Sequence, residues 1–183
     1  MIYKQKKSGT ELKFKFNEDN LEYFLKDSSG SFTKNIPYEN ISNETFEHFE
    51  KNVAHKNNAI YSLVIGIIFL MINFATGIRL AAGLFLIASL VFFILYKFGQ
   101  NKYTVLKSRE QDIFILQNKQ HNLIKNKILN TRNEFIKKTY LNIDKKSNIG
   151  NEINKFKWLK HLKIISNEEF KNYKNKVEKT FEK

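Results

Sequence analysis

An almost uncharged apolar block, residues 59–96, makes up about a fifth of this 183-residue chain and limits the possible folds more than any other feature. Residues 59–77 and 80–96 carry no charged side chain, and Arg79 is the single cation between them. A helix rises about 1.5 Å per residue, so residues 59–77 would cover close to the roughly 30 Å hydrocarbon core of a bilayer. The block predicts a transmembrane hairpin over 59–98 with two helices, 59–77 and 80–96, and a short membrane turn at Gly77 and Arg79.

Two other interpretations of the block are less consistent with its charges. A single span would place Arg79 near the middle of the bilayer, where a cation costs at least about 2.5–3.5 kcal/mol. A buried helix pair in a water-soluble protein would need apolar surface elsewhere to cover both helices, and the flanks are polar and rich in lysine. The hairpin avoids both difficulties.

The cations around the block predict its orientation. The outer ends carry Lys51, Lys56, Lys97 and Lys102, whereas the turn carries Arg79 alone. Because positive charge gathers on the cytoplasmic side of membrane proteins, we expect a multi-pass protein with two spans and both termini in the cytoplasm. Its first expected partners are the lipid bilayer and the anionic lipids of the inner leaflet.

The flanks of the block contain strand patterns. Residues 12–16 alternate apolar and charged, residues 21–25 and 31–36 follow after polar turns, and residues 102–107 and 112–116 repeat the pattern beyond the block. Three short strands alone would not be stable, so we expect the later pair to complete the same small antiparallel sheet. The predicted fold class is therefore an α+β membrane protein whose sheet is interrupted by the hairpin.

Three further segments have helical periodicity. In residues 38–58 apolar side chains recur every three or four positions, which predicts a helix that lies at the membrane surface, runs into the first span or packs on the sheet. A long amphipathic helix is predicted over 120–141. After a polar linker at 144–150, residues 151–183 predict two short helices, the second starting with a capping box at Ser166 and Glu169. The domains are then 1–58, 59–98, 99–142 and 151–183.

The last segment resembles the short C-terminal domain family known as SHOCT. Ile153, Phe156 and Leu159 match its apolar repeat, and Ile165-Ser166-Asn167-Glu168-Glu169-Phe170 matches its second-helix motif, although Lys163 stands where the family usually has glycine. Residues 10–141, above all 130–141, resemble bacterial membrane proteins in which a PH-like domain is interrupted by a helical hairpin. The resemblances imply an accessory unit that supports oligomerisation or partner contact.

Charge and composition exclude several classes of function. The net charge is +13, and residues 102–183 hold most of the excess, with twenty Lys and Arg against nine acids. Only three of the basic residues are Arg, which nucleic-acid readers use for bidentate contacts, so we do not expect nucleic acid as a partner. There is no cysteine, and the four histidines form no metal motif. We expect no enzymatic activity, no cofactor and no metal.

These observations predict a non-enzymatic, membrane-anchored adaptor or scaffold. Its PH-like domain would lie at the inner leaflet, and its tail would bind an unknown protein or a second copy. The residues expected to make this contact are Phe156, Trp158, Leu159, Ile165 and Phe170. One alternative is a membrane-active or stress-related hairpin protein, and another is a nucleic-acid binder that uses the basic tail.

Overall fold

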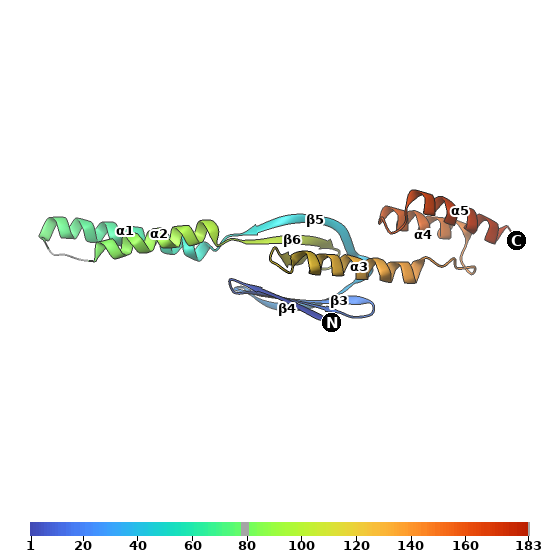
Figure 1. The fold of residues 1–183 in the computed structure, drawn as a ribbon, viewed down its shortest axis with the longest axis horizontal. Helices are drawn as coiled ribbons and strands as arrows, with labels where there is room; N and C mark the ends of the chain where they lie inside the picture. Colours follow the sequence, from blue (N-terminus) through green and yellow to red (C-terminus); the bar gives the residue numbers. More distant parts are fainter. Residues whose placement is uncertain (78–80, 183) are drawn as a thin grey trace. The chain divides into compact units, whose positions relative to one another are not determined.

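The computed structural model describes residues 1–77 and 81–182 (Figure 1). The chain divides into two compact units. Unit 1 contains Met1–Glu47 and Tyr103–Lys183, and unit 2 contains His48–Lys102. Unit 1 is thus built from two stretches of chain that lie on either side of unit 2 in the sequence.

Unit 1 begins with a four-stranded antiparallel sheet in the order β1 (Ile2–Lys7), β2 (Thr10–Phe16), β3 (Asn20–Asp27) and β4 (Gly30–Pro37). A two-residue turn joins β1 to β2, and both its residues, Ser8 and Gly9, have positive φ, as tight hairpins require. The strands predicted at 12–16, 21–25 and 31–36 are confirmed. β1 was not predicted, because three of its six residues are Lys and hide the alternation.

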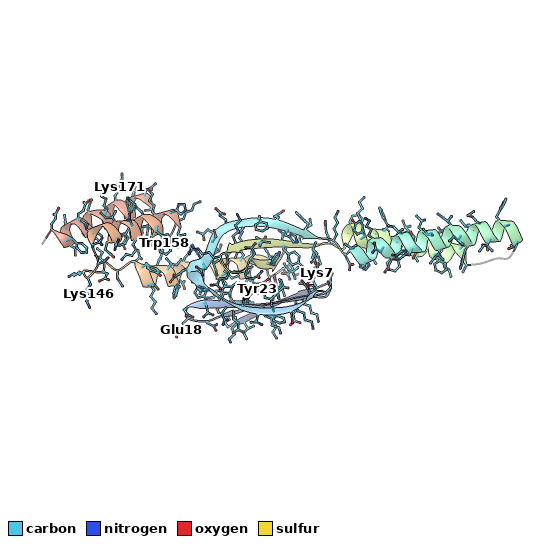
Figure 2. All side chains as sticks on the ribbon, turned by 180° about the vertical axis from the view of Figure 1, so that it is seen from behind. Lys7, Glu18, Tyr23, Lys146, Trp158 and Lys171 are labelled. Carbon is cyan, nitrogen blue, oxygen red and sulfur yellow. The ribbon has the colours of Figure 1, made fainter. Side chains whose placement is uncertain are left out.

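The second sheet contains three strands, β5 (Ile41–Glu50), β6 (Asn101–Ser108) and β7 (Ile113–Leu116). The expectation that residues 102–107 and 112–116 complete the first sheet is wrong, since β6 pairs with β5 and β7 pairs with β6 in a separate sheet. Side chains bridge the two sheets. The Gln5 amide donates to the Leu116 carbonyl and accepts from its N–H, both at 2.9 Å, and the Tyr23 hydroxyl accepts from the N–H of Phe114 at 3.2 Å (Figure 2).

The core of unit 1 lies between the two sheets and helix α3 (His121–Tyr140). The first sheet buries Leu12, Phe14, Leu21 and Tyr23, the second buries Val105, Leu106, Ile113 and Ile115, and α3 adds Ile124 and Ile128. The helix predicted at 120–141 is confirmed within one residue. Its apolar stripe closes the space between the sheets, as an amphipathic helix does in a layered domain.

The helix predicted over 38–58 is wrong for residues 38–52, whereas residues 53–58 are helical and begin the first helix of unit 2. Only Tyr38–Asn40 form a single 3-10 turn, after which the chain runs as β5 to Glu50. The three- and four-residue spacing of apolar side chains here does not mark the buried face of a helix. Phe46 and Phe49, which belong to this pattern, lie in β5 and are 41% and 48% exposed. Hydrogen bonding to β6, which lies beyond residue 100, determines the structure of this segment.

Unit 2 contains two helices, α1 (Val53–Thr76) and α2 (Ala82–Phe98), and it corrects the predicted fold class. Among the described residues only α1, with 24 residues, is long and apolar enough to cross a membrane. α2 has 17 residues, or about 25 Å of helix, which is shorter than the roughly 30 Å hydrocarbon core. The two-span transmembrane hairpin is therefore wrong, although the overall α+β composition holds.

The structure describes where α1 ends and where α2 begins. Gly77 has a φ of 72° and ends α1, with its N–H donating to the Asn73 carbonyl at 3.0 Å. A left-handed residue at this position is a common helix stop, so Gly77 forms the predicted end of the helix. Arg79, the other predicted turn residue, lies outside the described residues. α2 begins only at Ala82, without a side-chain cap.

Helices α4 (Ile149–His161) and α5 (Asn167–Phe181) form the end of unit 1. The predicted capping box is confirmed. The Ser166 hydroxyl accepts from the Glu169 N–H at 3.1 Å, and the Glu169 carboxylate accepts from the Ser166 N–H at 2.7 Å. This second bond holds the pKa of Glu169 below its ordinary value. Lys163, in the turn between the helices, has a φ of 57°, a conformation that favours glycine.

Candidate membrane-insertion site

The two helices of unit 2 pack directly against each other. Gly66 of α1 faces Leu86, and a Cβ added there would lie 2.8 Å from its side chain. The rings of Phe69 and Phe85 meet edge to face at 5.3 Å. The Ser89 hydroxyl donates to the Ala59 carbonyl at 2.8 Å. Small residues and one interhelical hydrogen bond thus allow the close approach that is typical of helices packed in lipid.

The outer surface of the helix pair is apolar over most of its length. Of the most apolar 18-residue stretch of α1, only 11% is buried. Exposed apolar side chains occur on both helices, including Met71 at 67%, Phe74 at 97%, Leu84 at 69% and Ile87 at 62%. Water-soluble proteins rarely expose an apolar patch of this extent, and such a patch marks a membrane or protein contact.

One end of the pair carries lysines that lie over aromatic rings. Lys51 Nζ lies 5.6 Å from the Tyr96 ring centroid, Lys97 lies 5.9 Å from Phe98, and Lys102 lies 5.6 Å from Phe49. We call these three pairs the lysine–aromatic collar. Aromatic rings and long cationic side chains are enriched where a membrane meets water. The collar therefore gives the helix pair the chemistry of a headgroup layer at this end.

A groove of about 440 Å³ runs between the helices on one side of the pair. It is lined by Ala59, Ile60, Leu63, Leu86, Ser89, Leu90 and Phe93. Ala59 and Ser89 are almost fully buried and form its floor, whereas Leu63 and Leu90 are 44% and 60% exposed and form its walls. The groove therefore has the size and lining of a site for an apolar chain.

The expected interaction residues lie in and around the core of the terminal helices. Phe156, Leu159 and Ile165 are buried there, with Phe156 stacked on Tyr173 at 4.6 Å. Trp158 and Phe170 are half-buried against the same core, and Trp158 also meets Tyr140 of α3 edge to face at 5.2 Å (Figure 2). Of these five residues, only Trp158 and Phe170 are accessible to a partner while the core of the terminal helices stays closed.

A buried arginine in α3 was not foreseen from the sequence. Arg132 is fully buried, and its Nε donates to the Ile41 carbonyl at 2.6 Å, while Nη1 donates to the side-chain oxygens of Asn43 and Asn133. Burial lowers its pKa. Asn43 in turn donates to the Leu162 carbonyl at 2.8 Å. Arg132 thus joins α3 to the start of β5, and Asn43 extends this link to the turn between α4 and α5.

The outer face of the first sheet is basic. By strand register Lys4 lies opposite Lys13, and Lys15 lies between Ile2 and Glu22. Lys13 and Lys15 form ion pairs with Glu11 and Glu22, at 3.1 and 2.8 Å. Lys4 and Lys6 of β1 are exposed on the same face. This surface has a positive excess and could contact an acidic partner.

Within residues 1–77 and 81–182, no group of three or more His, Asp or Glu side chains is arranged to hold a metal ion. Comparison of the chain with protein-family models, with curated proteins and with solved structures gave no match.

Proposed function

We propose that this protein is a membrane-anchored adaptor or scaffold, held in lipid by unit 2. The observation that carries the proposal is α1, an apolar helix of 24 residues whose surface is almost entirely uncovered. Lipid would cover this surface and remove its apolar area from water. In this proposal the helix pair inserts into lipid as a unit, with α1 as the helix long enough to reach across the hydrocarbon core and α2 packed along it.

The sheet topology supports placing both parts of unit 1 on one side of the membrane. β5 precedes α1 and β6 follows α2, and the two strands are neighbours in one sheet. The chain therefore enters and leaves unit 2 on the same side of the bilayer. The collar lysines supply the positive charge that favours the cytoplasmic side, so the finer proposal is that both termini are cytoplasmic.

Unit 1 would be the adaptor part, and we propose no catalytic role for it. Two packed antiparallel sheets followed by α3 support the comparison with PH-like domains. The basic outer face of the first sheet and the half-buried Trp158 and Phe170 are the surfaces that a partner could reach. Because Phe156, Leu159 and Ile165 hold the terminal helices together, oligomerisation through them would require this core to open.

The test is extraction of membranes with alkaline carbonate, which releases peripheral proteins and leaves integral ones. The full chain should stay with the membrane. Ile67→Asp places a charge in the middle of α1, where it costs about 2.5–3.5 kcal/mol of insertion free energy, so this variant should be partly released. The matched control is Leu123→Asp in α3, an exposed position outside unit 2. Release of the unaltered chain would disprove the proposal.

A further inference from the structure

We propose that the groove between α1 and α2 binds one acyl chain of an acidic phospholipid, with its phosphate held by Lys56 and Lys97. This inference rests on the proposed function, because only a chain inserted in a bilayer would meet such a ligand. It goes further by naming a ligand class and two residues that select it.

The position of the two lysines follows from helix periodicity. Residues four apart lie one turn from each other on the same face of a helix. Lys56 is therefore one turn from Ile60, a groove residue of α1, and Lys97 is one turn from Phe93, a groove residue of α2. Lys56 and Lys97 each lie one helical turn from the groove, in the direction of the end of the helix pair that carries the lysine–aromatic collar. Two exposed cations thus flank the same end of an apolar groove.

The ligand class follows from this combination. An apolar groove accepts a hydrocarbon chain, and two cations at its end accept an anion. A phospholipid with a net negative headgroup supplies both within one molecule. The groove volume of about 440 Å³ lies within the range of roughly 300–1,000 Å³ that small-molecule sites occupy.

His55 lies one helical turn before the groove residue Ala59 on α1. Its ring stacks on Phe92 at 6.2 Å, and its buried Nδ1 has no hydrogen-bond partner within the part of the chain that the structure describes. Buried polar atoms usually have partners in protein or solvent. A headgroup oxygen near Lys56 and Lys97 would lie within one helical turn of this ring.

The experiment measures the lipids that stay bound to the full-length protein. The protein is reconstituted in vesicles of equal amounts of phosphatidylcholine and phosphatidylglycerol, and native mass spectrometry then counts the retained lipids. We expect one phosphatidylglycerol per chain, enriched over phosphatidylcholine. Each lysine near an anionic headgroup contributes up to about fivefold in affinity, so the double variant Lys56→Gln/Lys97→Gln should retain both lipids equally.

Two controls separate the groove from general surface charge. Lys51→Gln/Lys102→Gln removes two collar lysines, which are not one helical turn from a groove residue, and should keep the enrichment. Leu63→Trp/Leu90→Trp enlarges the exposed groove walls, and should lower retention of both lipids without changing membrane insertion. Each of these results would support the proposal.

The inference and the proposed function fail differently. If carbonate releases the chain, the membrane anchor itself is disproved. If the chain stays in the membrane but its retained lipid matches the vesicle composition, only the lipid site is overturned. Equal loss of phosphatidylglycerol enrichment in the two lysine double variants would also overturn the lipid site. A mass spectrum that shows a dimer without bound lipid would overturn it too, because the groove would then be covered by a second copy of the chain.

Discussion

At the scale of single residues, Arg132 has the most demanding position in unit 1. A fully buried guanidinium without a carboxylate partner is costly unless its donors are used. Here Nε and Nη1 bind three oxygens, whereas Nη2 has no partner within the described residues. The rigid fork of donors is what holds Ile41 and Asn43 at the start of β5.

Arg132→Lys keeps the charge but loses this fork, because an ammonium group cannot reproduce the planar arrangement. We expect the free energy of unfolding to fall by about 1–2 kcal/mol. The measurement is denaturant unfolding of the full chain in detergent, followed by the fluorescence of Trp158, the single tryptophan in the sequence. Arg109→Lys at an exposed position is the matched control, and equal stability of the two variants would contradict the prediction.

A second residue-scale prediction concerns Lys163 and its φ of 57°. The left-handed conformation costs a residue with a Cβ about 1–2 kcal/mol, and glycine removes this cost at the expense of a more flexible unfolded chain. Lys163→Gly should therefore stabilise the terminal helices by about 0.5–1 kcal/mol.

The control for Lys163 is Lys160→Gly, which places glycine inside the last turn of α4. There it should destabilise by about 1 kcal/mol. Thermal unfolding followed by Trp158 fluorescence measures both variants. If the midpoint of thermal unfolding falls in both Lys163→Gly and Lys160→Gly, the turn at Lys163 is not strained.

At the scale of elements, the contact between α1 and α2 depends on one glycine. A side chain at Gly66 would collide with Leu86, whereas a Cβ at Gly83 would meet nothing within 4 Å. Gly66→Ile should therefore separate the helices and cost about 1–3 kcal/mol, and Gly83→Ile should be tolerated. Hydrogen exchange of the α2 amides in detergent measures the difference. Equal protection in the two variants would mean that the helices do not pack at this point.

The elements that could be predicted from the sequence are those fixed by local patterns. The capping box at Ser166, the stripe of α3 and the tight turns of the first sheet all depend on neighbours a few residues away. β5 could not be predicted in this way, because its pairing with β6 spans residues 51–100. The sequence also indicated the collar lysines, but the groove arises from the packing of two helices and has no linear motif.

At the scale of the whole molecule, the proposed anchor predicts one topology. Since β5 and β6 are neighbours in a sheet, residues before and after unit 2 should face the same side of the membrane. The chain contains no cysteine, so single substitutions can report this directly. Ser28→Cys and Asn172→Cys should both react with a membrane-impermeant maleimide from the cytoplasmic side only.

Reaction of the two cysteines from opposite sides would contradict the proposed topology and the sheet pairing together. Thr76→Cys, at the far end of α1, is the control, because it should not react from the cytoplasmic side while the membrane is intact. Labelling after the membrane is dissolved confirms that each cysteine is reactive.

The pairing of β5 with β6 also has a consequence for biosynthesis. While the ribosome is making unit 2, the first sheet has already emerged, but β6, β7 and α3 that cover its apolar face do not yet exist. Chains are made at about 5–20 residues per second, so Leu12, Phe14 and Tyr23 stay uncovered for seconds during membrane insertion. A nascent chain arrested before residue 101 should therefore be a substrate for chaperones that bind exposed apolar strands.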